Sequence, residues 1–186
     1  MQTELPLDTD RLTLRPFTHA DFDAVRSYRS RDDVARYLYW EPNTEHEVRA
    51  VLERKAASTS IRAEDDVLAL VVVVKETGAL IGEVTLHLVS DEHRQAEVGF
   101  IIHPDHAGIG YATEAVRPLL RVAFEDLGLH RVIGRLEARN VASARVLEKL
   151  GMRREAHLVE NEWVKGEWQS ELVYAMLDRE WPAATG

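Results

Sequence analysis

The sequence contains no cysteine among its 186 residues. Disulfide bonds, thiolate nucleophiles and cysteine-bound zinc are therefore excluded, and this composition suits a reducing compartment. Long apolar runs are also missing, because the longest, residues 67–74, is far shorter than the roughly 20 residues that cross a bilayer as a helix. The first ten residues are acidic and lack the apolar core of a signal peptide. We therefore expect a cytoplasmic protein with no membrane partner.

Basic residues are in the minority. The chain carries 23 Lys and Arg against 32 Asp and Glu, a net charge of −9. A nucleic-acid-binding surface needs clustered Lys and Arg, so we expect no nucleic-acid partner. The charge would favour a cationic partner such as an amine, although an acidic surface also serves solubility alone. The length predicts a single domain, residues 1–186, with enough chain for a full core.

The most informative stretch covers residues 96–115. Residues 96–102 (AEVGFII) are mostly apolar or β-favouring, which is typical of a buried strand. A short loop with Gly108 and Gly110 follows, and from Tyr111 apolar residues recur at helical spacing. A loop that opens a helix presents free backbone N–H groups and the positive end of the helix dipole. The sequence therefore predicts a binding site for a phosphate-bearing group at this loop.

The glycine pair does not fit two other phosphate-binding motifs. A Walker loop is excluded, because the glycines are not followed by a lysine and a hydroxyl residue. The dinucleotide fingerprint fails because Thr113 stands where the third glycine should be. A nicotinamide-dependent dehydrogenase would thus rest on Gly108 and Gly110 alone, and such a pair can also simply close a turn.

Periodicity along the rest of the chain predicts a mixed, mostly antiparallel sheet of about six to seven strands with helices on both faces, an α/β (α+β) fold. The expected strands are residues 11–16, 67–75, 80–89, 96–102, 130–138, 152–158 and 171–177. The expected helices are residues 18–30, 44–58, 111–127 and 140–149, with a turn or two at 33–38. A right-handed crossover makes strands 96–102 and 130–138 parallel.

Four stretches resemble the GNAT family of N-acetyltransferases, and most closely its RimJ/RimL-type branch, which acetylates ribosomal-protein N-termini. HAGIGYATEA (106–115) is similar to the family's acetyl-coenzyme A loop, R/Q-x-x-G-x-G/A. TDRLTLRPFTHAD (9–21), AEVGFII (96–102) and ARNVASARVLEKLGM (138–152) are similar to its first strand and helix, its fourth strand, and its N-x-x-S-x-x-x-L-x-K-x-G-F element. The resemblance implies a GNAT-like fold in which strands 96–102 and 130–138 splay apart.

The resemblance implies acetyl-CoA as co-substrate, no metal, and direct transfer of the acetyl group to a primary amine, either a protein N-terminal α-amine or a small amine. By family position, the coenzyme-binding residues are Phe100, Ile101, Ile102, Ala107, Gly108, Ile109, Gly110, Tyr111, Ala112, Asn140 and Ser143. The first three would bind the pantetheine arm, and the backbone of 107–112 the pyrophosphate. Asn140 can equally be the N-cap of its helix. Ser143 would protonate the departing thiolate, or merely fill the first helical turn.

Two carboxylates compete for the role of general base, the group that takes the proton of the attacking amine. Glu162, in an expected loop at 161–169, matches an acid of RimL-type enzymes, and Glu97 matches a common fourth-strand acid. Either could instead be a surface carboxylate. Trp40, Glu97 and Trp163 are expected to contact the acceptor, although Trp40 could equally anchor its loop to the core.

Three positions depart from the family pattern. Ala107 occupies the R/Q position, Leu147 stands where many members carry a thiolate-protonating Tyr, and Ser170 replaces an Asp. These departures keep open a second hypothesis, a non-catalytic acetyl-CoA-binding or sensing module of the same fold. The sequence is compatible with a monomer or a homodimer.

Overall fold

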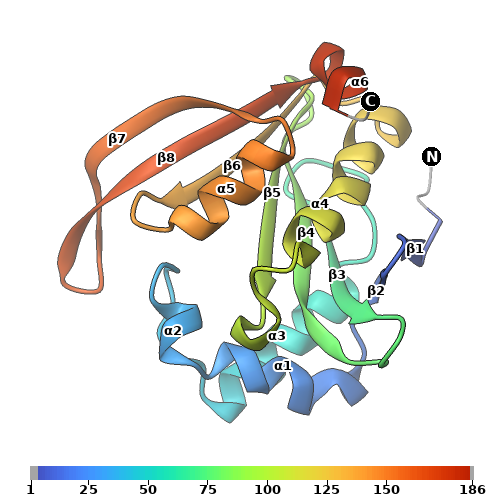
Figure 1. The fold of residues 1–186 in the computed structure, drawn as a ribbon, viewed down its shortest axis with the longest axis vertical. Coiled ribbons are helices and arrows are strands. Elements are labelled where there is room, and N and C mark those ends of the chain that lie inside the picture. The colour runs from blue at the N-terminus through green and yellow to red at the C-terminus, as the bar shows by residue number, and fades with distance from the viewer. Residues whose placement is uncertain (1–3, 185–186) are drawn as a thin grey trace.

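A computed structural model describes residues 4–184 and contains one eight-stranded sheet with the strand order β1-β2-β3-β4-β5-β6-β8-β7 (Figure 1). The strands are β1 (Leu7–Asp8), β2 (Leu12–Pro16), β3 (Val67–Val74), β4 (Leu80–Ser90), β5 (Gln95–Ile102), β6 (Arg131–Glu137), β7 (Arg153–Val164) and β8 (Glu167–Leu177). Only β5 and β6 pair in parallel among these described strands, so the predicted mixed sheet is confirmed. The strand count is higher than expected because β1, at two residues, is too short to show an alternating pattern.

Helices cover both faces of the sheet, as predicted. They are α1 (Phe22–Arg29), α2 (Asp32–Ala35), α3 (Glu45–Ala57), α4 (Tyr111–Arg121), α5 (Val141–Lys149) and α6 (Trp181–Ala184). A π turn, Val122–Asp126, extends α4, and short 3-10 turns lie at His19–Asp21, Pro104–His106 and Asp178–Glu180.

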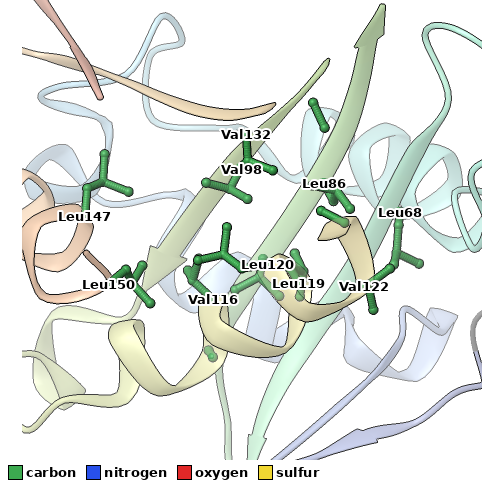
Figure 2. Close-up of a cluster of buried hydrophobic side chains, with 14 of the residues drawn as sticks. Leu68, Leu86, Val98, Val116, Leu119, Leu120, Val122, Val132, Leu147 and Leu150 are labelled. Carbon is green, nitrogen blue, oxygen red and sulfur yellow. The ribbon is translucent and has the colours of Figure 1, made fainter. Parts of the chain in front are cut away.

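Two apolar clusters sit on opposite sides of the sheet, because alternate strand residues face opposite ways. On β3, Leu68 and Leu70 join the cluster that includes α4 and α5, whereas Ala69 and Val71 join the cluster formed with α1 and α3. Figure 2 shows the first cluster, in which α4 and α5 present their labelled apolar side chains to the strands. The sheet is therefore sandwiched between two helical layers.

The sheet opens between its two parallel strands. The described pairing of β5 with β6 consists of Gln95 with Arg131, Ala96 with Val132 and Glu97 with Ile133. Beyond these pairs β5 continues to Ile102 beside β4 alone, and β6 continues to Glu137 beside β8 alone. The predicted splay of the two strands is confirmed.

The C-terminal hairpin differs from the prediction. We expected a loop at 161–169, but β7 and β8 continue to a two-residue turn, Lys165 and Gly166, whose φ angles are +52° and +81°. Positive φ at both turn residues suits the tight turn that best matches strand twist. Trp163 and Trp168 are cross-strand partners beside this turn, with ring centroids 5.3 Å apart in an edge-to-face arrangement. The prediction was wrong because Glu160 and Asn161, which resemble loop residues, form an irregularity inside β7.

Candidate active site

The glycine loop leads into a helix start, as predicted. Gly108 and Gly110 have φ angles of +81° and +91°, a left-handed conformation that favours glycine, and Gly110 is the N-cap of α4. The first N–H groups of a helix lack intrahelical acceptors, so this exposed start offers donors and a positive dipole end to an anion. Ala107 differs, because its N–H already donates to the Pro104 carbonyl at 3.0 Å. The backbone N–H groups that remain available to an anion in this loop are therefore those of residues 108–112.

A group of polar contacts, here called the polar clamp, ties the glycine loop and the first turn of α4 to residues 9–11, between β1 and β2. The Glu114 carboxylate accepts hydrogen bonds from the Arg11 Nε at 2.7 Å, the Arg11 backbone N–H at 2.9 Å and the Thr9 hydroxyl at 2.6 Å. Arg11 Nη1 donates to the Ile109 carbonyl at 3.2 Å. The sequence did not reveal this clamp, because its partners lie 103 residues apart and only the fold brings them together.

The far end of β5 provides an open backbone edge. Phe100, Ile101 and Ile102 pair with β4 on one side and lie beyond the last pair with β6 on the other. Gly82 on β4 allows this close pairing, because a Cβ there would lie 2.1 Å from the Ile101 carbonyl oxygen. The edge is thus held firmly from one side while its other side faces the gap.

The start of α5 lies at the same end of the gap, because α4 and α5 follow the two parallel strands. Asn140 caps α5, its side-chain oxygen accepting from the Ser143 N–H at 3.1 Å, so its capping role is confirmed. Ser143 is half-buried in the first turn. Leu147 is buried against β6, where a Cβ on Gly134 would meet it at 2.7 Å. Leu147 therefore supplies packing and no proton donor.

Four charged residues gather on the sheet face that carries α1 and α3. Glu97 is the last β5 residue paired with β6, and Arg135 follows two residues after its partner Ile133. Glu171 on β8 is 4% exposed, and its Oε2 accepts from Arg135 Nη2 at 2.8 Å and Nε at 3.1 Å. Glu162 on β7 lies 3.8 Å from the same guanidinium. Three carboxylates thus surround one arginine.

We call Glu97, Arg135, Glu162 and Glu171 the acidic cluster, and its electrostatics favour proton transfer. Burial raises the pKa of Glu97, and the positive charge of Arg135 opposes that rise. The Tyr39 hydroxyl donates to Glu171 at 3.4 Å, although the residue as a whole is exposed. A buried carboxylate with a raised pKa is a better proton acceptor than a solvated one.

The structure brings some predicted acceptor residues together and separates others. Glu97 and Glu162 both lie near Arg135, although Glu162 belongs to a strand and not to a loop. Trp163 follows Glu162 along β7, so it points to the opposite face, where it is 61% exposed beside Trp168. The structure therefore places Trp163 and Glu162 on opposite faces of the sheet.

Trp40 packs on the Arg29 guanidinium, whose carbon lies 4.9 Å from the ring centroid. Arg29 in turn pairs with the buried Glu83. Trp40 therefore anchors its loop, which is the alternative to acceptor contact that the sequence left open. The residue is half-buried, so part of its surface is still exposed. Tyr39, Arg135 and Glu171 were missed by the sequence analysis.

A separate groove of about 740 Å³ follows α4 away from Gly110. Its charged lining residues are Asp8, Asp10, Glu114, Arg117, Arg121, Glu125 and Lys149. Charges of both signs nearly balance there, so the groove gives no clear preference for an anion. It does not include Glu97, and the acidic cluster is the stronger candidate for chemistry.

A helix start at the mouth of two splayed parallel strands defines the class of fold, that of an N-acetyltransferase. The particular family follows from comparison with known proteins. Residues 11–153 match the family model described as "Acetyltransferase (GNAT) domain". The chain belongs to the GNAT family and is an N-acetyltransferase.

Relatives of known sequence or structure agree with this family. The uncharacterized N-acetyltransferase YnaD of Bacillus subtilis (strain 168) is 31% identical over 175 residues, covering 94% of this chain and 98% of YnaD. A spermidine N(1)-acetyltransferase of Vibrio cholerae is 28% identical over 159 residues, covering 86% of this chain and 88% of the relative. The crystal structure of a GNAT-family acetyltransferase from Bacillus anthracis has a TM-score of 0.86 at 30% identity, covering 95% of this chain and all of that one (100%).

A further structural neighbour is a spermidine N-acetyltransferase from Vibrio cholerae in complex with CoA and spermine. Its TM-score is 0.79 at 24% identity, with 94% of this chain and 99% of that chain covered, which shows a shared fold. None of these matches singles out the RimJ/RimL-type branch. No helix within residues 4–184 is long and apolar enough to cross a membrane.

Proposed function

We propose that this N-acetyltransferase transfers the acetyl group of acetyl-CoA to a small cationic primary amine, with Glu97 as the general base. The observation that carries the proposal is the place of Glu97 at the point where β5 and β6 part. From Ile102 to Glu97 the strand rises five residues, roughly 17 Å, a span suited to an extended pantetheine arm. A coenzyme whose diphosphate rests at the start of α4 would thus present its thioester beside Glu97.

The residues around the gap fit such a coenzyme. The amides of residues 108–112 and the α4 dipole would hold the diphosphate. The open edge of Phe100, Ile101 and Ile102 would pair with the amides of pantetheine, and the side-chain nitrogen of Asn140 would hydrogen-bond the same arm. The CoA bound to the Vibrio cholerae neighbour supports the use of this co-substrate.

The chemistry requires few groups. An alkylamine has a pKa of about 10.4, so a base must remove a proton before the nitrogen can attack. The ammonium first loses one proton to solvent. The amine nitrogen then forms a bond to the thioester carbonyl carbon, the carbon–sulfur bond breaks, and the second nitrogen proton passes to Glu97. The departing thiolate takes a proton from the Ser143 hydroxyl, which regains one from solvent.

The acidic cluster supports a cationic acceptor. Glu97, Glu162 and Glu171 face the single guanidinium of Arg135, which leaves excess negative charge when all are ionised. Such a cluster attracts an amine that carries a second positive charge. The Vibrio cholerae relative named spermidine N(1)-acetyltransferase supports a polyamine as the class of acceptor.

A thiol-release assay over a panel of amines tests the proposal. Spermidine, a monoamine of similar length and a peptide with a free N-terminus would be compared at saturating acetyl-CoA, with the acetylated product identified by mass spectrometry. We expect the highest kcat/KM for spermidine. Activity on the peptide alone would show that the acceptor is a protein N-terminal amine and not a small amine. No thermal shift with millimolar acetyl-CoA would overturn the proposed co-substrate, and binding without turnover would favour a non-catalytic module.

A further inference from the structure

Glu97 has a neighbour that the proposed reaction does not yet use. The β4–β5 register places His87 directly opposite Glu97. Opposed residues in antiparallel strands point to the same face, with Cβ atoms about 4.5–5.5 Å apart, so the imidazole is within reach of the carboxylate. His87 Nε2 lies 3.5 Å from Asp65 Oδ1, and the Asp65 side chain is 86% exposed. Three titratable groups therefore form a line from the strand divergence to solvent.

We propose that His87 relays the amine-derived proton from Glu97 to solvent by way of Asp65. This inference rests on the proposed function. After each transfer Glu97 holds the proton as a carboxylic acid. The imidazole accepts that proton at Nδ1 and releases one from Nε2 toward Asp65, so Glu97 returns to its carboxylate form. The His87 side chain is 39% exposed, so its ring protons exchange with solvent and the starting tautomer is restored before the next transfer.

The other charged groups that face Glu97 are poorly suited to this task. Arg135 on β6 is permanently protonated and cannot accept a proton. Glu171 on β8 is buried and already accepts two hydrogen bonds from Arg135. On the other side of His87, β3 presents the apolar Val67. An imidazole can accept a proton at one ring nitrogen while it releases one from the other, and Nε2 of His87 already faces Asp65, which makes His87 the suitable carrier.

Chemical rescue provides the test. In the full chain, His87→Ala should lower kcat at least ten-fold with little change in the KM for the acceptor. Added imidazole should restore much of the lost kcat, because a free imidazole can occupy the vacated space and carry the proton. His87→Gln keeps a polar side chain beside Asp65 but cannot relay a proton, so we expect the same loss of kcat. His93→Ala, at an exposed histidine between β4 and β5, is the matched control and should leave kcat, KM and the response to imidazole as in the wild type.

The outcomes separate the relay from the proposed function. An active wild type with unchanged kcat in His87→Ala overturns the relay alone. A folded His87→Ala whose lost kcat is not restored by imidazole also overturns it, because a structural defect would not respond to a proton carrier. Should the alanine variant fail to fold, the glutamine variant decides by its kcat. A wild type inactive with every amine overturns the proposed function and the relay with it.

Discussion

Glu97 lies on a strand interior, where a carboxylate is normally a liability, and it sits at the divergence of the parallel pair. Removal of its charge should therefore affect chemistry more than folding. We expect Glu97→Gln to lower kcat by about 10²- to 10⁴-fold, the usual contribution of a positioned base, while acetyl-CoA still binds. Initial rates and acetyl-CoA titration calorimetry measure the two effects.

The pH dependence gives the same prediction a second readout. Since burial raises the pKa of Glu97, the acid limb of kcat/KM should lie above the ordinary range of a glutamate, and activity should rise as pH passes upward through that pKa. Glu97→Gln should abolish this limb. Glu162→Gln is the matched control at the competing carboxylate. A larger loss of kcat in Glu162→Gln than in Glu97→Gln would assign the role of general base to Glu162 on β7.

A second glutamate, Glu83, has a structural task. It is 2% exposed and accepts hydrogen bonds from the Tyr28 hydroxyl at 2.8 Å, Arg29 Nη2 at 2.5 Å and Lys55 Nζ at 2.8 Å. Burial alone would raise the pKa of Glu83, but Lys55 and Arg29 overcome this and lower it to about 2. The cluster ties α1 and α3 to β4, beneath the Trp40 loop.

Glu83→Gln should destabilise the protein by about 3–5 kcal/mol, because it leaves two buried cations without their anion. The pKa of Glu83 is lowered on folding, so its ionised form stabilises the native state above about pH 4.5, and this contribution is lost as pH falls toward about 2. Urea unfolding across that pH range should show that the free energy of unfolding falls steeply with decreasing pH in the wild type and less steeply in the variant. Glu45→Gln, in an exposed pair with Arg49, should change stability by less than about 1 kcal/mol. Equal effects of the two substitutions would contradict a structural role for the cluster.

At the scale of elements, the start of α4 depends on a left-handed glycine. Gly110→Ala must adopt a φ near +91°, and its Cβ would approach Arg11 Nη2 to 3.4 Å. A non-glycine residue in this conformation costs about 1–2 kcal/mol, which we expect to appear as an acetyl-CoA Kd raised about ten-fold. Calorimetry measures the Kd. Gly78→Ala, in the β3–β4 turn at φ +70° with open space around its Cβ, should lower stability similarly and leave the Kd unchanged. Equal Kd values for wild type and Gly110→Ala would argue against a coenzyme site at this loop.

Elements with a strong local pattern could be predicted from the sequence. The β5 strand, the glycine loop and α4 each carry their own signal over a few consecutive residues, and their order implied the parallel pair. The β7–β8 hairpin could not be delimited in this way, because Glu160 and Asn161 interrupt the alternation while pairing resumes at Glu162. The Lys165–Gly166 pair indicates a two-residue hairpin turn only once the strand register shows that Trp163 and Trp168 are paired on either side of it.

The acidic cluster was only half predictable for a related reason. Glu97 and Glu162 were found through the family pattern, whereas Arg135 and Glu171 resemble solvated charges on strands. They meet across 36 residues of chain, at a register that no local pattern specifies. Side-chain pairs between strands depend on which residues stand opposite, and a shift of one residue would turn each to the other face.

At the scale of the whole molecule, the charge of −9 and the acidic cluster should act together on a cationic acceptor. Raising the ionic strength from about 0.01 M to about 0.15 M shortens the Debye length from about 30 Å to about 8 Å, which screens the protein's electrostatic field beyond the acidic cluster. We expect kcat/KM for spermidine to fall roughly ten-fold over this range, and to fall less for a monoamine, because long-range attraction grows with acceptor charge. Glu162→Gln, which removes one carboxylate beside Arg135, should lower the salt sensitivity for spermidine without removing it. Steady-state rates at constant pH measure each slope. If both amines and both proteins gave the same slope, the negative charge would serve solubility alone, and acceptor choice would have to come from shape and short-range contacts at the acidic cluster.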